Sequence, residues 1–164
     1  MLLPENKERG FTLIEILVVI GIIAILAAIV IVAINPAKQF AQARNTQRQA
    51  GVNAILNAIG QRIADNKGVF AGDFTIGGID YHCGELPTTT PATITTENTA
   101  GTLGALGCLV PTYISSLPTD PTYVSGVDTK YDVKADAAGR ITVCANLAAN
   151  ETSIPGASAI CVTR

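Results

Sequence analysis

The sequence lacks the residue combinations that most enzymes and metalloproteins need. Its 164 residues contain a single histidine, and they contain no Cys-x-x-Cys pair, haem-attachment motif or Cys/His zinc spacing. They also lack a nucleophile with a recognisable partner base and a phosphate-binding glycine loop after a strand. These absences argue against an enzyme, a haem protein, a metal site, a cofactor and a small-molecule substrate.

Charged residues are almost missing from the stretch that follows Gly10. Twenty-four residues run from there to Ile34, and the only strongly polar side chain among them is Glu15. A helix of that length reaches about 36 Å, which exceeds a hydrocarbon core of about 30 Å. A core helix of a soluble domain would have a polar face, and this stretch has none. It is therefore predicted to be a membrane-resident helix.

Glu15 needs a separate explanation. An ionised acid near the bilayer centre costs roughly 2.5–3.5 kcal/mol, although Glu15 lies close enough to the start of the run to sit near the interface. An intramembrane carboxylate is by default a functional residue that requires a partner. The alternative is a tolerated interfacial glutamate.

The ten residues before the apolar run differ from a secretory signal. Such a signal has an apolar region of about 7–15 residues before its cleavage site, whereas residues 1–10 are short and polar. Lys7 and Arg9 favour a cytoplasmic location for this segment, which leaves the C-terminal part outside.

The junction between the two segments resembles a known processing site. Lys7-Glu8-Arg9-Gly10 joined directly to Phe11-Thr12-Leu13-Ile14-Glu15 is similar to the N-terminus of type IV prepilins and type II secretion pseudopilins. The resemblance extends to about Asn66. It implies that a membrane peptidase cuts between Gly10 and Phe11 and methylates Phe11, and that Glu15 and Phe11 act in assembly.

The resemblance also implies an α+β, pilin-like fold, in which a long N-terminal helix packs on a small antiparallel β-sheet head. The expected segments are a cleaved leader at 1–10, a transmembrane and filament-core helix at 11–34, an amphipathic helix at 35–67 and a disulfide-stabilised head at 68–164. Asn35-Pro36 follows the apolar run, and a proline inside a continuing helix would bend it. In the family a proline often lies one turn earlier, where this chain has Val32, so the position of any bend stays open. Gly21 is a second candidate for helix flexibility.

Residues 37–66 have the pattern of an amphipathic helix. Apolar residues recur at four- and three-residue spacing and form a stripe of Val52, Ile55, Leu56, Ile59 and Ile63. This stripe should pack on the head. The polar faces are expected to contain Lys38, Arg44, Arg48, Gln61 and Arg62. The helix is predicted to end at Asn66-Lys67-Gly68.

The head should begin irregularly and end in strands. Residues 68–107 are rich in Gly, Thr and Pro and are predicted to be loop-like, and eight threonines lie in Leu86–Thr102. That tract is either plain irregular structure, the preferred interpretation, or an exposed glycosylated loop.

Alternating residues in the last third of the chain predict a β-sheet. Lys130–Lys134 and Arg140–Ala145 are expected to form a hairpin, and Ala159–Thr163 a further strand.

Four cysteines lie in the second half of the chain. An even number beyond a membrane anchor indicates an oxidising compartment and two disulfides. Three connectivities are possible. The pairing Cys83–Cys108 with Cys144–Cys161 closes the shortest loops and is the one predicted, each bridge contributing about 3 kcal/mol.

The acids of the head offer little for a metal. Tyr113–Pro121 resembles the segment before the sheet in major pseudopilins, a family that can bind calcium nearby. The spacing of Asp120, Asp128 and Asp132 matches no calcium loop, so they are predicted to be surface acids. His82 is expected to be a structural or surface residue.

The net charge of −2 is unevenly distributed. Residues 35–67 have five bases and one acid, whereas residues 68–164 have nine acids and four bases. This difference would let the stalk of one copy lie beside the heads of others, or it is only a solvated helix beside an acidic surface. Binding of nucleic acid by the isolated head is not expected, because the bases lie on a helix destined for a filament interior.

Three functions follow from these patterns. The first is a subunit of an extracellular type IV pilus, a homo-oligomeric filament. Before assembly this subunit would cross the inner membrane once, and prepilin peptidase and a membrane assembly machinery would act on it. The second is a pseudopilus subunit of a secretion system, which Leu117–Pro121 favours. The third is a single-pass anchored binding protein that needs neither processing nor Glu15.

Overall fold

The computed structural model describes residues 10–99, 102–123 and 126–164. The predicted leader, apart from Gly10, lies outside the described residues. The chain divides into two units, Met1–Gln39 and Phe40–Arg164, which are treated separately below.

The apolar run forms the helix α1 (Leu13–Ile34), and a second helix, α2 (Pro36–Asp65), follows it. Asn35 ends α1 in the left-handed conformation, with φ 47°, and its carbonyl and side-chain oxygens accept the Lys38 N–H. Pro36 takes the first position of α2, where its missing N–H is not needed. The expectation of a proline inside one continuing helix is therefore wrong. Gly21 lies within the uninterrupted α1, and the flexibility of both positions stays a prediction.

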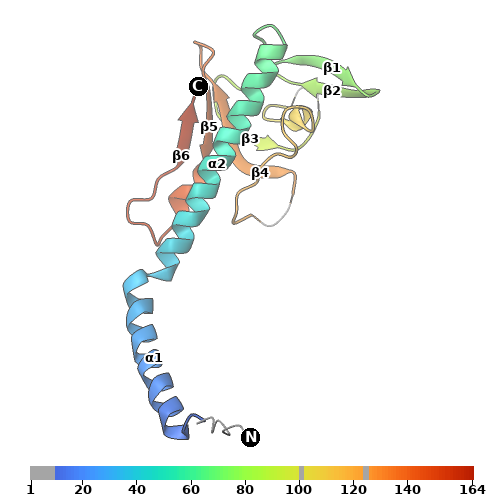
Figure 1. The fold of residues 1–164 in the computed structure, drawn as a ribbon. Helices are drawn as coiled ribbons and strands as arrows, with labels where there is room; N and C mark the ends of the chain where they lie inside the picture. Colours follow the sequence, from blue (N-terminus) through green and yellow to red (C-terminus); the bar gives the residue numbers. More distant parts are fainter. Residues whose placement is uncertain (1–9, 100–101, 124–125) are drawn as a thin grey trace, which may run out of the picture. The chain divides into compact units, whose positions relative to one another are not determined.

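A four-stranded antiparallel sheet forms the body of the head, and α2 lies along one of its faces (Figure 1). Its order is β3 (Ala92–Thr95), β4 (Asp128–Ala135), β5 (Ile141–Ala145) and β6 (Ile160–Thr163). Val133 lies opposite Val143, and Cys144 lies opposite Cys161. The predicted hairpin and final strand are confirmed.

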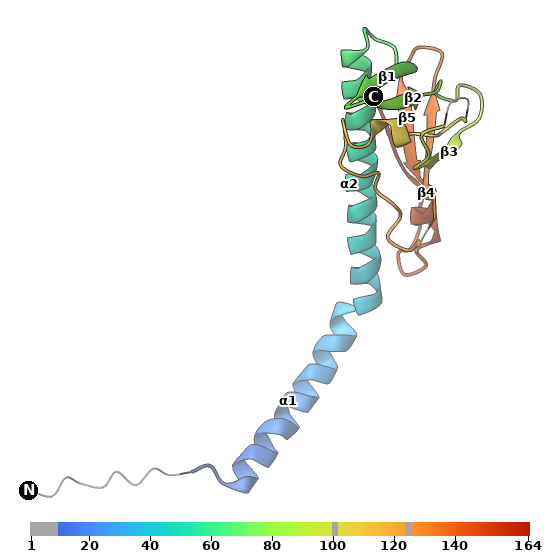
Figure 2. The same cartoon turned by 90° about the vertical axis from the view of Figure 1, so that its right-hand side faces the viewer.

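The second sheet, β1 (Gly72–Ile76) and β2 (Ile79–Cys83), lies near the C-terminal end of α2 (Figure 2). Gly77 and Gly78 connect the two strands, and both have positive φ, as a tight hairpin turn requires. The prediction of a loop-like region at 68–107 is wrong here and at β3. Phe74, Ile76, Ile79 and Tyr81 alternate with polar residues across the two glycines, so the hairpin signal was present.

The core of the head lies between α2 and the sheet. Val52, Ile55, Leu56 and Ile59 are buried there with Tyr131, Val133 and Val143 of the sheet, and Ile63 packs at the edge. Gly51 is required by this packing, because a Cβ there would lie 2.8 Å from the Tyr131 hydroxyl. The predicted stripe is confirmed. So is the helix end, where the Gly68 N–H bonds to the Ile63 carbonyl at 2.8 Å.

Candidate functional site

The predicted cleavage site lies immediately before α1. Gly10 and Phe11 are exposed and non-helical, and Thr12 is extended with φ −79° and ψ 151°. Among the described residues, nothing lies within 4 Å of a Cβ added to Gly10. The Gly10–Phe11 bond is therefore accessible. Any requirement for glycine at this position would come from the peptidase, not from the fold of this chain.

Thr12 and Glu15 form a capping box that fixes the start of α1. The Glu15 N–H donates to the Thr12 hydroxyl at 3.3 Å, and the Thr12 N–H donates to Glu15 Oε2 at 2.7 Å. The Thr12 hydroxyl also donates to Oε2 at 2.7 Å. This reciprocal arrangement satisfies two N–H groups that have no partner within the helix. Glu15 Oε1 has no hydrogen-bond partner among the described residues.

α1 presents apolar side chains on every side. All 22 of its residues are exposed, and it is the one helix of the described chain that is long and apolar enough to cross a membrane. At about 1.5 Å per residue it extends roughly 33 Å, close to the thickness of a hydrocarbon core. The helix needs lipid or other helices around it, because water would hydrate its whole surface.

Two disulfides join distant parts of the head. Cys83 at the end of β2 bonds to Cys108 in a short 3-10 turn (Gly107–Leu109), and Cys144 of β5 bonds to Cys161 of β6. The first links the two sheets through this turn, and the second ties the final strand to its neighbour. All described cysteines are paired.

A buried ion network, not anticipated from the sequence, attaches α2 to two loops. Arg48 donates to Asp120 at 2.6 Å and to Glu151 at 2.5 Å, and both Arg48 and Asp120 are 1% exposed. Glu151, which directly follows a 3-10 turn (Asn146–Asn150), also pairs with Arg44 at 2.5 Å. Arg48 lies four residues before Val52, on the helical spacing of the apolar stripe, and this spacing was the available signal.

The network keeps its carboxylates ionised. Hydrogen bonds from Arg44 and Arg48 lower the pKa of Glu151 to about 2. Burial opposes ionisation of Asp120, but hydrogen bonds from Arg48 and Thr122 hold its pKa below the usual value. Burial raises the pKa of Tyr131 to about 12, and the nearby charge of Asp120 adds to the rise. The network therefore serves as a structural attachment and not as an acid–base pair.

Two residues expected on polar faces of α2 are buried instead. Arg48 belongs to the ion network, and Arg62 is 5% exposed, where it donates to the Gly72 carbonyl at 3.0 Å and lies 4.5 Å from the centre of the Phe74 ring. Because Arg44 and Arg48 bind acids of the same head, less of the positive charge of this helix remains for other molecules.

The predicted surface acids are used in different ways. Asp120 is buried, so that prediction is wrong for it. Asp128 pairs with Lys130 at 2.6 Å, and Asp132 accepts from Asn146 at 2.5 Å. His82 pairs with Asp73 at 2.9 Å. Within the described ranges, no three His, Cys, Asp or Glu side chains group as metal ligands.

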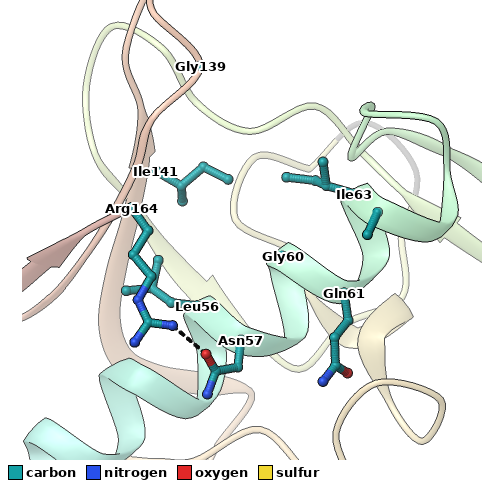
Figure 3. A pocket seen from close by; sticks show the side chains of 9 residues that line it. Leu56, Asn57, Gly60, Gln61, Ile63, Gly139, Ile141 and Arg164 are labelled. Carbon is teal, nitrogen blue, oxygen red and sulfur yellow. Dashed lines mark hydrogen bonds between the residues drawn. The ribbon is translucent and has the colours of Figure 1, made fainter.

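A groove of about 550 Å³ lies on the head between α2, the start of β5 and Arg164 (Figure 3). Leu56, Ile63 and Ile141 supply its apolar lining, and Asn57 and Gln61 supply amides. Arg164 closes one side by donating to Asn57 and to Asn53. Aliphatic and amide groups can contact another molecule, but they do not act as nucleophiles.

An exposed apolar helix after a basic–Gly–Phe junction, followed by a disulfide-bonded α+β head, is compatible with a protein anchored in a membrane by that helix. The family model of the prokaryotic N-terminal methylation motif matches residues 6–31. At these residues the chain has the class III signal of type IV pilins and pseudopilins, which supports a pilin- or pseudopilin-like protein. Comparison with curated proteins and with solved structures found no match.

Proposed function

We propose that this chain is a structural subunit that polymerises through α1 into an extracellular type IV pilus. The motif implies processing by prepilin peptidase and handling by a pilus assembly machinery. In the proposed sequence of events, the chain is held in the inner membrane by α1 and cut between Gly10 and Phe11. It is then methylated on Phe11 and incorporated into a filament of identical copies.

The observation that supports this most is the use of the Glu15 carboxylate. Oε2 is occupied by Thr12, whereas Oε1 has no partner among the described residues. Cleavage would create a positive amine on Phe11 at the head of an otherwise neutral apolar segment. An unpaired charge in a low-dielectric bundle is costly, so both groups require a partner.

Staggered helices would meet this requirement. Oε1 of one copy can accept a hydrogen bond from the Phe11 amine of the next without breaking the capping box. The contact would be made only at one axial offset, so we expect it to set the register of the helices more than to add net stability.

Processing is tested by mass spectrometry of the exported protein. Phe11 should be found at the N-terminus with an added methyl group, and replacing Gly10 with a bulky residue should leave the precursor in the inner membrane. The accessible Gly10–Phe11 bond predicts that this variant folds normally and fails only at cleavage. An intact Met1 on wild-type exported protein would contradict the proposal and favour the anchored binding protein.

A pseudopilus subunit is the second candidate, supported by the Leu117–Pro121 segment. In this chain Asp120 of that segment is buried against Arg48. The two candidates differ in where the filament is found. Immunogold labelling of long surface filaments, in cells that lack the outer-membrane secretion channel of a type II system, would favour the pilus. Labelled filaments that require that channel would favour the pseudopilus.

A further inference from the structure

The two disulfides of the head differ in their burial. Cys83 and Cys108 are 4% and 0% exposed and belong to the apolar core. Cys161 is exposed, and its partner Cys144 is half-buried. Exposed disulfides are the ones that exchange with other thiols, because an attacking thiolate has to reach one of the two sulfur atoms. In the folded head a thiolate can therefore reach the Cys144–Cys161 bridge, whereas the core shields the Cys83–Cys108 bridge.

Cys161 also lies on an open edge of the four-stranded sheet. β6 is the outermost strand, and Ile141 of β5 and Arg164 exchange both backbone hydrogen bonds, at 2.6 and 2.9 Å. Opposite residues of an antiparallel pair alternate between hydrogen-bonded and non-hydrogen-bonded, and Cys161 lies an odd number of residues before Arg164. The N–H and C=O groups of Cys161 and Thr163 therefore point away from β5. Within the described ranges, these groups have no other backbone partner.

The opposite edge of the same sheet is closed. The Thr95 N–H of β3 donates to the Gly104 carbonyl at 2.9 Å, and the Leu106 N–H donates to the Thr95 carbonyl at 3.1 Å. Open edges are usually protected by charged side chains or proline, but Ile160–Thr163 contains neither. The outer edge of β6 is thus available to an extended segment of another protein, which can add a strand there.

Contacts other than the disulfide also hold β6 in place. The Thr163 and Thr142 hydroxyls share a hydrogen bond of 2.8 Å, and the Arg164 side chain donates to Asn53 and Asn57 of α2. The strand keeps its ladder with β5, and its half-buried side chains pack against the core. Opening of the Cys144–Cys161 bridge should therefore leave the head folded, as reversible exchange requires.

We propose that Cys144–Cys161 is an exchangeable disulfide and that the outer edge of β6 is the docking site of a dithiol oxidoreductase that acts on it. The inference does not depend on whether the chain forms a pilus, because the bridge and the edge both belong to the head.

The exchange proceeds in two steps. A thiolate of the oxidoreductase attacks Cys161 Sγ and forms a mixed disulfide, while the bond to Cys144 breaks and Cys144 Sγ leaves with the electron pair and takes up a proton. The second thiol of the oxidoreductase loses its proton and attacks the enzyme sulfur of the mixed disulfide, which releases Cys161 as a thiolate that is protonated in turn. Two electrons pass to the head, and the oxidoreductase becomes a disulfide. The reverse sequence closes the bridge.

The first test is differential alkylation of the full-length protein in detergent. Brief treatment with dithiothreitol is followed by one alkylating reagent, and then by denaturation, complete reduction and a second reagent of different mass. Mass spectrometry should find the first label on Cys144 and Cys161 while Cys83 and Cys108 have only the second. Labelling of all four cysteines at one rate, or of Cys83 and Cys108 first, would overturn the proposal.

The second test uses a thioredoxin variant that lacks its resolving cysteine and therefore stops at the mixed disulfide, which should form on Cys161. Thr163→Pro removes an outward N–H and no bond to β5, a position where proline is tolerated. Loss of one hydrogen bond should slow trapping roughly three- to tenfold and leave the rate with dithiothreitol unchanged. Thr163→Ala is the matched control, because it loses the same hydroxyl contact and retains the N–H.

The outcomes separate the two parts of the proposal. A mixed disulfide on Cys144 would overturn the point of attack, and equal trapping of the two Thr163 variants would overturn docking at the edge of β6. Hydrogen exchange on wild-type protein tests the docking without any substitution. The N–H groups of Cys161 and Thr163 should exchange more slowly once thioredoxin is attached, and an unchanged rate would overturn the docking as well.

Discussion

The two helices of this chain depart from the usual rule that apolar residues are buried and charged residues are exposed. In α1 all 22 residues are exposed, although nearly all are apolar. In α2 nine of 30 residues are buried, and two of these are arginines. The head pairs Arg48 with two of its own acids, whereas α1 leaves both its apolar surface and one oxygen of Glu15 without partners in the described chain. The comparison shows that the head buries its apolar core within one chain, whereas the apolar surface of α1 needs lipid or other helices around it.

The largest effect, a loss of filament formation, should come from changes at Glu15, the one charged residue of α1. Glu15→Ala and Glu15→Gln are expected to leave membrane insertion, processing and folding of the head intact while abolishing or crippling filament formation. The two variants separate its roles, because glutamine at this position preserves a capping box and removes only the charge. Filaments are counted by electron microscopy at matched protein levels.

A structural control accompanies these variants. Thr12→Ser retains a capping hydroxyl and should assemble normally. Normal filaments from Glu15→Ala would contradict the assembly role and leave Glu15 a tolerated interfacial residue.

The next largest effect, a loss of stability of the head, should come from Arg48, the arginine that is buried against two acids. Arg48→Ala leaves Asp120 buried without its guanidinium partner and removes one of the hydrogen bonds to Glu151, and breaking such a buried pair costs about 3–5 kcal/mol. Arg44→Ala is the matched control, because its side chain is 35% exposed and solvent screens its charge, so its loss should cost less than the loss of Arg48. Urea unfolding of the full chain in detergent measures both. Equal losses from the two variants would contradict the idea that burial sets the effect.

The disulfides should have a somewhat smaller effect, confined to the head. Their cysteines are 25 and 17 residues apart, so each bridge should contribute about 3 kcal/mol by restricting the unfolded chain. Paired alanine variants should lower the stability of the head and leave insertion and processing of α1 unchanged. Non-reducing peptide mapping should show Cys83–Cys108 and Cys144–Cys161. Four free thiols in the exported protein would contradict the prediction of an oxidising compartment. A crossed pairing would contradict only the predicted connectivity.

The local elements of both helices and of the sheet could be predicted from the sequence, whereas the long-range contacts of the head could not. α1 is a long unbroken apolar run, the apolar stripe of α2 and the β4–β5 hairpin have periodic patterns, and each was found where expected. The β1–β2 hairpin was not predicted because residues 68–107 are rich in glycine and threonine and the alternation around Gly77 and Gly78 is short. The ion network was missed because its members are about 70 and 100 residues apart. Residue type alone placed Arg48 and Asp120 on the surface, and only tertiary packing brings them together.

The smallest expected effect is the acid sensitivity of the head, and it depends on Glu151. The pKa of this carboxyl is about 2 in the folded chain, against 4.5 for the ordinary group. A lowered folded-state pKa means that the stabilisation is fully present above about pH 5 and is lost as the pH falls toward about 2. The difference corresponds to about 3 kcal/mol at most, because one pKa unit is about 1.4 kcal/mol. The lowered pKa of Asp120 also makes the head less stable as the pH falls.

Glu151→Gln should therefore be less stable than wild type at neutral pH, and its stability should fall less steeply with acid. Urea unfolding of both proteins between about pH 7 and pH 3 should show two curves that converge toward low pH. Parallel curves would show that Glu151 does not supply the acid sensitivity of the head.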